Sequence, residues 1–483
     1  DDGCVHGPPS MVKQRLSPVT LPENLRLPSE SQYLNCIRCG LCLAVCPTYR
    51  EYLSETTSPR GRVALARKGL EGELKLSPNL ARQMYACFDC LACNDICPVG
   101  IRPADLALKM RHVQEQIHPV CWKQTLFGGL IPKPNRMEAA TWPLRVYEKL
   151  GIRRLVYALG LRSLLPGKIR DLEAVLPHLP QRPLRQMLPE VTQANVVVPV
   201  PARDVVVPVP ARVGETRYRV GFFLGCAQSL MFAEESAASV RVLARNGCTV
   251  VTPKETVCCG MPALGYGRTD LVHEQARVNI ALFEKANVET IVTDCATCGS
   301  TLKDYDKLLA DDPAWAARAA AFSSRVRDVS EFLMSIPLEK PQGRIDARVT
   351  YHDPCHLRRG QGVWKQPREL LKMIDGLEFV ELPEADWCCG SAGSQLITHY
   401  ETSLKVLKRK ADNIASTQAD YIASGCPGCQ MQLNVGMRRQ GLDVQVVHPI
   451  ALLDRAYRQQ ESEVSRLRRN QEISHSGVKR KNG

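Results

Sequence analysis

The sequence predicts an α/β fold in which one parallel-sheet domain occurs twice, preceded by an all-α domain at the N-terminus. The duplication is indicated by a cysteine pattern that residues 219–453 carry in two copies: a single cysteine, a Cys-Cys-Gly triplet and a Cys-x-x-Cys pair. Within each copy, short apolar runs alternate with segments of helical spacing, which is typical of parallel sheets covered by helices. The matched cysteines recur at near-constant offsets, as expected of a duplicated domain: 129, 130 and 131 residues for Cys226 and Cys355, Cys258 and Cys388, and Cys295 and Cys426.

Each apolar run of the duplicated region leads into a cysteine element and is therefore an expected strand. These runs are residues 219–224, 249–252 and 290–293 in the first copy and 348–352, 378–382 and 421–423 in the second. Helical spacing predicts helices over residues 237–246, 270–286, 367–374 and 400–417. Because ligands bind at the carboxyl ends of strands in open α/β sheets, the cysteines are expected to gather there.

Five thiols from three separate places meet in each predicted site, and so many soft ligands indicate a metal or iron–sulfur centre. Five exceed the four that one cubane cluster needs, which favours an unusual, non-cubane cluster or a spare thiol that changes with redox state. Zinc on four of the thiols, or disulfides, remain alternatives. The flanking His352 and His356 are expected to support the ligands or to pack. The candidate ligands are Cys226, Cys258, Cys259, Cys295 and Cys298 in the first copy, and Cys355, Cys388, Cys389, Cys426 and Cys429 in the second.

Two cysteine runs near the N-terminus, over residues 36–47 and 87–98, match the C-x2-C-x2-C-x3-C-P spacing of two-cluster ferredoxins. Three closely spaced thiols hold one cubane [4Fe–4S] cluster, while the fourth, followed by proline, reaches the other cluster. Tetrahedral zinc needs neither a third Cys-x-x-Cys step nor a trailing Cys-Pro. Residues 62–71 and 78–85 have helical spacing, so this ferredoxin-type domain is expected to be all-α. The expected ligand sets are Cys36, Cys39, Cys42 and Cys97 for the first cluster, and Cys87, Cys90, Cys93 and Cys46 for the second.

The order of these features predicts seven segments along the chain. A proline-rich arm precedes the two-cluster domain, and a basic helical connector and a Pro/Val repeat separate that domain from the duplicated half. Within the connector, residues 142–165 mix leucine and valine with arginine, which suits a helix that lies on anionic lipid or packs on neighbouring domains. The expected boundaries are 1–30 for the arm, 31–118 for the two-cluster domain, 119–195 for the connector, 196–216 for the linker, 217–342 and 343–457 for the two copies, and 458–483 for a basic tail.

The composition of the 483 residues limits the classes of function. Of 21 cysteines, 18 fall into the motifs above, which indicates metal ligation in a reducing compartment rather than disulfides. No run of 18 apolar residues occurs, so no membrane-spanning helix is expected. The formal net charge of +13 suits acidic partners or anionic lipid, whereas 6% aromatic residues and the lack of a binding motif disfavour nucleic acid. A cytoplasmic location is expected, with peripheral contact to the inner face of the cytoplasmic membrane as an option.

Together, these motifs resemble those of the cysteine-rich CCG-domain proteins, specifically the iron–sulfur subunits of glycolate oxidase. The likeness covers residues 32–457 and extends to the iron–sulfur subunits of lactate-using enzymes, anaerobic glycerol-3-phosphate dehydrogenase and heterodisulfide reductase. The motifs that carry it are Phe223-Leu-Gly-Cys226, Cys258-Cys-Gly260, Asp294-Cys-Ala-Thr-Cys-Gly299, His352-Asp-Pro-Cys-His356, Cys388-Cys-Gly-Ser-Ala-Gly393 and Val447-His-Pro-Ile-Ala-Leu-Leu453.

The resemblance implies an electron-transfer subunit of a flavin-dependent 2-hydroxyacid dehydrogenase that acts on glycolate or lactate. Because no Gly-x-Gly-x-x-Gly fingerprint follows a strand, FAD is expected only on a partner dehydrogenase subunit. Two cubane clusters and one or two further clusters would carry electrons from that flavin to a quinone or another carrier. The alternative is a catalytic thiol–disulfide reductase of the heterodisulfide type, with the five thiols of the second copy as its redox centre. A metal-stabilised scaffold without redox function is a third hypothesis.

Overall fold

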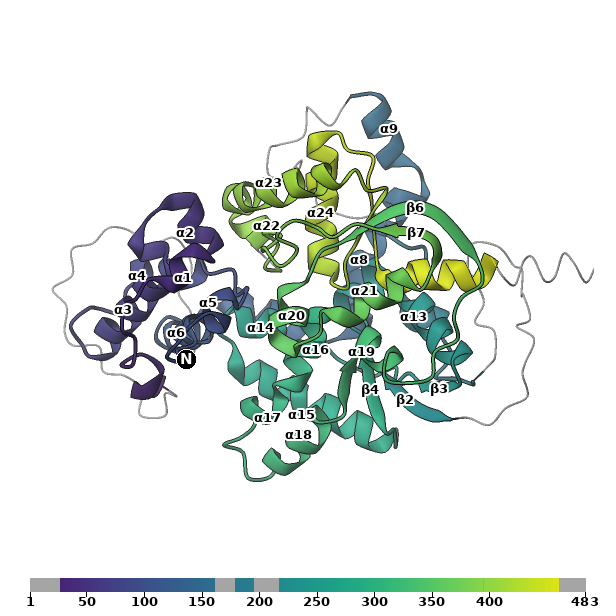
Figure 1. Ribbon diagram of the computed structural model, residues 1–483. Helices are drawn as coiled ribbons and strands as arrows, with labels where there is room; N and C mark the ends of the chain where they lie inside the picture. Colours follow the sequence, from purple (N-terminus) through teal and green to yellow (C-terminus); the bar gives the residue numbers. More distant parts are fainter. Residues whose placement is uncertain (1–26, 161–178, 195–216, 394, 460–483) are drawn as a thin grey trace, which may run out of the picture.

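The computed structural model describes residues 27–160, 179–194, 217–393 and 395–459. A helical N-terminal unit lies beside two α/β domains, which pack directly on each other (Figure 1). The predicted fold class is therefore confirmed. The expected linker, and most of the expected arm and basic tail, lie outside the described residues.

The N-terminal unit is all-α, as the spacing of residues 62–71 and 78–85 predicts. Its longer helices α3, α4 and α6 begin at proline, and Ser58 and Ser77 cap α3 and α4 by accepting from backbone N–H groups three residues on. Val63, Met84 and Met110 are buried between these helices. The six helices of the unit are α1 (Leu41–Ala44), α2 (Pro47–Tyr52), α3 (Pro59–Leu70), α4 (Pro78–Tyr85), α5 (Ala92–Asp95) and α6 (Pro103–Ile117).

The connector is also helical, but the single amphipathic helix expected over residues 142–165 is not formed. Helix α8 (Pro134–Lys149) ends just before Gly151, which has a left-handed φ of 69°, and α9 (Ile152–Ala158) begins after it as a separate helix. Residues 161–165 lie outside the described part of the chain. Several apolar side chains of α8 and α9 are exposed instead of packing on neighbouring domains, namely Trp142, Leu144, Leu150, Ile152, Leu155 and Leu159.

Both α/β domains contain the same run of four parallel strands, which is the structural counterpart of the repeated cysteine pattern. The first sheet has the order β1-β3-β2-β4-β5 and the second the order β7-β6-β8-β9, and only β1 is antiparallel. The expected strands are found within a few residues, whereas β1, β5 and β9 were not expected because they lead into no cysteine. The strands are β1 (Val191–Thr192), β2 (Tyr218–Phe222), β3 (Cys248–Val251), β4 (Thr290–Thr293), β5 (Val326–Asp328), β6 (Arg344–Tyr351), β7 (Asp375–Phe379), β8 (Tyr421–Ala423) and β9 (Gln445–Val447).

The helices between the strands connect these parallel neighbours and cover the sheets. In the first domain they are α12 (Cys226–Met231), α13 (Ala233–Arg245), α14 (Met261–Gly265), α15 (Thr269–Lys285), α16 (Ala296–Lys303), α17 (Tyr305–Leu308), α18 (Ala316–Ser323) and α19 (Val329–Leu333). In the second they are α20 (Cys355–Gln361), α21 (Lys365–Lys372), α22 (Gln395–Thr398), α23 (Tyr400–Thr417) and α24 (Pro427–Gln440). No helix in the described ranges is long and apolar enough to cross a membrane.

One hydrophobic core joins the two α/β domains. It contains Phe222 from β2 together with Val349 and Tyr351 from β6, all fully buried. Leu243 of α13 and Tyr457, in a helix over residues 449–459 that is yellow in Figure 1, complete it. The two copies are therefore halves of one packed unit, and their cysteine-bearing edges are held in fixed relation.

Leu243→Ala is expected to lower the free energy of unfolding by about 2–5 kcal/mol, because it opens a cavity in this shared core. Leu155→Ala is the matched control, since Leu155 is 56% exposed and a surface truncation changes stability by about 0.5 kcal/mol or less. Thermal-unfolding midpoints of the two variants, measured without oxygen, check the difference. Equal midpoints would show that the two domains do not share a core.

Candidate metal centres

The four thiols expected for the first cubane cluster line one cavity. Cys36, Cys39, Cys42 and Cys97 all border it, although they come from two cysteine runs far apart in the sequence. The backbone reverses at Arg38 and Gly40, which both have left-handed φ, so the three thiols of the first run turn inward. Cys39 is exposed and the other three are partly buried. This centre therefore lies at the protein surface.

The four thiols expected for the second cubane cluster are all buried. Burial raises the pKa of Cys93 well above its usual value, and the adjacent thiols of Cys87, Cys90 and Cys46 raise it further. Left-handed φ at Asp89 and Leu91, both between cysteines of this run, folds the backbone around the site.

Buried arginines lie beside the second thiol set. Arg111 donates to the carbonyl oxygens of Met84 and Cys87, at 2.9 and 2.7 Å. Arg62 donates to the carbonyl oxygen of Gln83 at 2.8 Å. Two fixed cations in this region offset the negative charge that four thiolates would bring into a buried site.

The five thiols of the first CCG domain converge at the carboxyl ends of β2, β3 and β4. Cys226 Sγ lies 3.6 Å from Cys258 Sγ, and the thiols of Cys258 and Cys298 lower the pKa of Cys259 well below its usual value. Cys295 caps α16 by accepting from the Cys298 N–H group at 3.4 Å. All five therefore belong to one site, at the sheet edge where the sequence places it.

The glycine before the first cysteine of this domain leaves space for the thiols. A Cβ atom on Gly225 would lie 3.3 Å from Cys298 Sγ, closer than most such contacts. On the far side, Asn279 of α15 donates to the Cys258 carbonyl oxygen and Tyr305 to the Cys259 carbonyl oxygen, at 3.2 and 2.9 Å. These two side chains hold the Cys-Cys segment in place.

The second CCG domain assembles its thiols in the same way. Cys389 Sγ lies 3.3 Å from Cys429 Sγ, and Cys388 Sγ accepts from the Gly390 N–H group at 3.3 Å. Hydrogen bonds from Cys388 and Cys429 lower the pKa of Cys389 to about 5, which favours the thiolate that metals require. Cys355 lies nearby and contributes to the electrostatic environment of this pair.

A buried lysine in the second CCG domain takes the place that Asn279 has in the first. Lys410 of α23 is fully buried and donates to the carbonyl oxygens of Glu384 and Ala385, just before the Cys-Cys segment. Burial lowers the pKa of Lys410 to about 8, while the thiols of Cys389 and Cys388 favour its charged form. At neutral pH this site therefore includes a buried cation.

The two flanking histidines differ in position. His356 lies 3.5 Å from Cys355 Sγ and 3.4 Å from a carboxylate oxygen of Asp89 in the N-terminal domain. Burial alone would lower the pKa of His356, but Cys355 and Asp89 raise it well above its usual value. His352 is buried, and burial lowers its pKa to about 3. His352 also forms a potential metal-binding group with Cys389 and Cys429, whose ligand atoms all lie within 4.8 Å of one another.

The donor sets fit thiolate-bound iron–sulfur clusters. Two groups of four thiols follow ferredoxin spacing, and two groups of five gather at sheet edges, where most of them are buried. Close sulfur–sulfur contacts of 3.3 and 3.6 Å within the CCG groups show that the thiols converge without forming disulfides. Such soft donor sets suit iron–sulfur clusters or zinc, and not hard cations such as magnesium.

The four thiol sets form a row that the sequence order does not reveal. Cys42 and Cys93 share an apolar cluster, so the two cubane sets are neighbours. Cys90 and Cys388 pack in one apolar cluster, and this contact joins the second cubane set to the second CCG set. Thr297, between the paired cysteines of the first CCG domain, lies 3.4 Å from Cys426 Sγ of the second. In this row the second cubane set thus adjoins the second CCG set, and the first CCG set lies at the far end.

Buried polar side chains lock the two CCG domains together behind these sites. Glu235 accepts from the His448 N–H group at 3.0 Å and from the Gln430 amide at 2.9 Å. His448 Nε2 lies 3.0 Å from the Asp294 carbonyl oxygen, and the Asp294 carboxylate accepts from Ser236 at 2.5 Å. Burial raises the pKa of Glu235 to about 7 and that of Asp294 to about 6. The domain contact therefore contains carboxyl groups that are uncharged below neutral pH.

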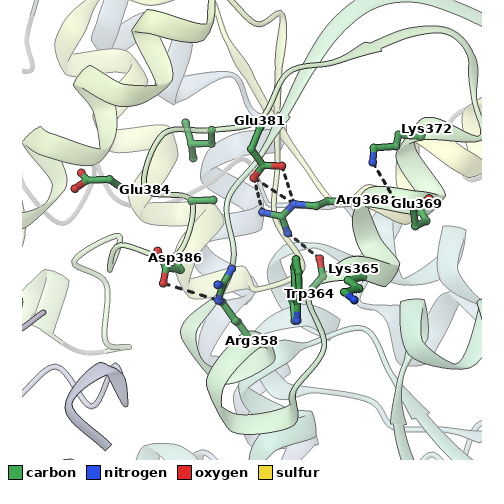
Figure 2. Close-up of a pocket in the computed structure, with 11 residues that line it drawn as sticks. Arg358, Trp364, Lys365, Arg368, Glu369, Lys372, Glu381, Glu384 and Asp386 are labelled. Carbon is green, nitrogen blue, oxygen red and sulfur yellow. Dashed lines mark hydrogen bonds and ion pairs between the residues drawn. The ribbon is translucent and has the colours of Figure 1, made fainter. Parts of the chain in front are cut away.

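A charged pocket lies next to the second CCG site (Figure 2). Its two arginines are already paired: Arg368 with Glu381 and with the buried Asp353, and Arg358 with Asp353 and Asp386. Asp353 lies two residues before Cys355, so these ion pairs fix the start of α20. Both arginines of this pocket are already paired with carboxylates and so have no unpaired charge to offer a ligand. Their ion pairs support the segment that leads to Cys355.

Three family models match the chain. A cysteine-rich CCG domain matches residues 220–303 and 349–434, a 4Fe-4S dicluster domain matches residues 32–101, and the linker region of the glycolate oxidase iron-sulfur subunit matches residues 121–176. The match to the linker region covers most of the helical connector. The matched order is that of the structural units described above.

Two relatives are similar over most of the chain and a third over about half of it. The probable glycolate oxidase iron-sulfur subunit of Bacillus subtilis is 36% identical, over 88% of this chain and 94% of its own length. The glycolate oxidase iron-sulfur subunit of Escherichia coli is 29% identical, over 84% of this chain and 91% of its own. Lactate utilization protein A of Oceanobacillus iheyensis is 33% identical over 49% of this chain and 96% of its own.

Glu235→Gln is expected to stabilise the protein relative to the wild type, and this effect is expected to be larger at pH 8 than at pH 5.5. The pKa of Glu235 in the folded protein is about 7, above the usual 4.5. Between pH 4.5 and pH 7 this residue ionises only in the unfolded chain, so the wild type loses stability as the pH rises. The full loss is about 3 kcal/mol, and the glutamine variant avoids it. Thermal midpoints at both pH values check this, with exposed Glu369→Gln as control. A wild type and a Glu235→Gln variant that respond alike to pH would contradict the assignment.

Proposed function

The chain belongs to the family of glycolate oxidase iron–sulfur subunits, and from this premise we propose that it carries electrons in a flavin-dependent 2-hydroxyacid dehydrogenase complex. In this proposal glycolate or lactate is oxidised on a partner subunit that holds FAD. Electrons then leave the complex for a quinone or another carrier. The relatives are named for glycolate oxidase and lactate utilization, which disfavours a thiol–disulfide reductase as the main activity.

The observation that carries this proposal is the continuous row of thiol sets. Iron–sulfur clusters, when bound, accept and release single electrons. The chain's contribution is to hold four such sites in contact and to keep water from the junctions. At the central junction, Phe88 and Val406 surround the contact between Cys90 and Cys388 and are themselves buried. A disulfide-cleaving centre would need one open CCG site, whereas eight of the ten CCG cysteines are buried and the other two, Cys226 and Cys355, are half-buried.

The first cubane set is the proposed docking end for the flavoprotein. Cys39 is exposed, and it is bordered by the exposed apolar side chains of Ile37 and Leu41. Short-range electron transfer between proteins requires a centre near the surface, which the exposure of Cys39 provides. The first CCG set, at the other end of the row, is the proposed exit.

Contact with the cytoplasmic membrane is proposed for the connector. Helices α8 and α9 expose Trp142, Leu150, Leu155 and Leu159 in a protein with net positive charge. Such apolar side chains beside basic ones bind the boundary region of anionic bilayers. A location on the inner face of this membrane would bring the exit close to quinone.

The proposed function is tested with the complex purified without oxygen together with its native flavoprotein. Addition of glycolate, D-lactate or L-lactate is expected to bleach the visible absorption of the clusters and to produce EPR signals with one of these acids. If no hydroxyacid reduces clusters that dithionite does reduce, the proposed function is wrong. Disulfide substrates would then be tested next.

The row itself is tested by Cys90→Ala, which removes the thiol at the central junction. With the oxidisable hydroxyacid, reduction of the CCG centres is expected to slow by at least about 100-fold, since proximity and orientation are lost, while dithionite still reduces them. Cys248→Ala is the control, because Cys248 is buried in β3 outside every thiol set. Unchanged reduction of the CCG centres in Cys90→Ala would show that electrons bypass this junction.

Membrane contact is tested with vesicles that contain phosphatidylglycerol. The double variant Leu150→Asp, Leu155→Asp is expected to reduce co-sedimentation with these vesicles at least about tenfold, because charged side chains do not enter the bilayer boundary. The control is Val278→Asp, which changes an exposed apolar residue on α15. Equal loss of co-sedimentation in both variants would show that the connector does not make the membrane contact.

A further inference from the structure

The imidazole of His352 lies inside the second CCG site with one nitrogen unaccounted for. The residue directly follows β6 and is 1% exposed. Its Nδ1 atom lies 3.1 Å from the Ala385 carbonyl oxygen, whereas Nε2 has no hydrogen-bond partner among the described residues. The potential ligand atoms of His352, Cys389 and Cys429 all lie within 4.8 Å of one another.

The contact at Nδ1 determines what Nε2 can do. A carbonyl oxygen only accepts hydrogen bonds, so the Nδ1 atom of His352 carries the proton. In the neutral ring, Nε2 then has a free lone pair. Nearly all metal-binding histidines have this arrangement, in which one nitrogen donates to a carbonyl or carboxylate and the other faces the metal.

The neighbouring thiols cannot satisfy Nε2 once the site is loaded. Cys389 and Cys429 bind a metal only as thiolates, which have no proton to donate. A lone pair buried between two metal-binding thiolates is therefore left without a partner unless it binds the same centre. A histidine with only a structural role would instead turn its unprotonated nitrogen toward a hydrogen-bond donor. His448 does this, since its Nδ1 atom accepts from the Ile450 N–H group at 3.2 Å.

The first CCG site offers no such nitrogen. Phe223 occupies the matching position, three residues before the first cysteine of the set, and is fully buried. It stacks on Phe283 with ring centroids 6.2 Å apart, as part of the apolar core around that site. The duplication has thus kept all five cysteines in both copies but places imidazole in only one of them.

We propose that His352 Nε2 is a direct ligand of the iron–sulfur centre in the second CCG domain. This rests on the proposed function only in requiring an iron–sulfur centre at that site. The second centre is then held by thiolates and one neutral imidazole, and the first by thiolates alone. A neutral imidazole that takes the place of one of the five thiolates makes the iron–sulfur centre less negative, so the second CCG centre has the higher reduction potential of the two.

The test uses the full chain, loaded with iron, reduced by dithionite and labelled with 15N-histidine. Pulsed ENDOR of the wild type is expected to show one centre with the strong 15N coupling of directly bound imidazole. His352→Phe, which copies the first site, is expected to lose this coupling. In a redox titration the same centre is expected to shift to lower potential. His448→Phe is the control, because His448 lies at the domain contact and not in a thiol set.

Three results would overturn the proposal. The first is an iron-loaded wild type with no strongly coupled histidine nitrogen, which needs no variant and so does not depend on how His352→Phe folds. The second is coupling that persists in His352→Phe. The third is a second CCG site that contains no iron. Failure of the hydroxyacid to reduce the clusters, with the nitrogen coupling intact, would instead reject the proposed function and leave the ligand assignment standing.

Discussion

The structure depends most on the contact between the N-terminal domain and the second CCG domain at Cys90 and Cys388. The two cysteines pack together inside one apolar cluster. Arg359 reaches across the same boundary toward the Cys90 carbonyl oxygen, and Arg111 donates to the Gly265 carbonyl oxygen of the first CCG domain at 2.8 Å. Buried arginines that bridge backbone carbonyls resist separation, because parting would leave desolvated charges without partners. This contact turns separate thiol sets into one row.

When bound to metal, 18 thiolates bring negative charge into mostly buried sites, and different side chains offset this charge at each site. Arg62 and Arg111 lie beside the buried cubane set, and Lys410 beside the second CCG set. In the first CCG domain neutral Asn279 and Tyr305 hold the Cys-Cys segment, and the cation comes from the connector, where Arg185 donates to the carbonyl oxygens of Lys254 and Thr256. Fixed positive charge stabilises a more reduced centre, so the duplicated sites differ in electrostatics although their cysteines match.

Much of the fold and of the thiol sets was predictable from the sequence, because the signals for them lie in short stretches of the chain. Cysteine spacing sets which thiols gather, and the strands at 290–293 and 421–423 are found as predicted because apolar runs that lead into cysteine are strong signals. The order of the sites was not predictable, since it depends on which thiol set of the duplicated half lies against the second cubane set. Nor was the position of His352 Nε2, because the Ala385 carbonyl that orients the ring is 33 residues away. The break at Gly151 was missed because apolar spacing continues across it.

The central claim is that both CCG domains hold iron–sulfur centres that continue the row begun by the cubane pair. The most direct measurement is the iron and zinc content of the protein isolated without oxygen, with Mössbauer spectra to assign the iron. Four [4Fe–4S] clusters predict about 16 iron atoms per chain and no zinc. About eight iron atoms together with about two zinc ions would contradict the claim, because the duplicated half would then be a zinc-bound scaffold beside a two-cluster ferredoxin domain.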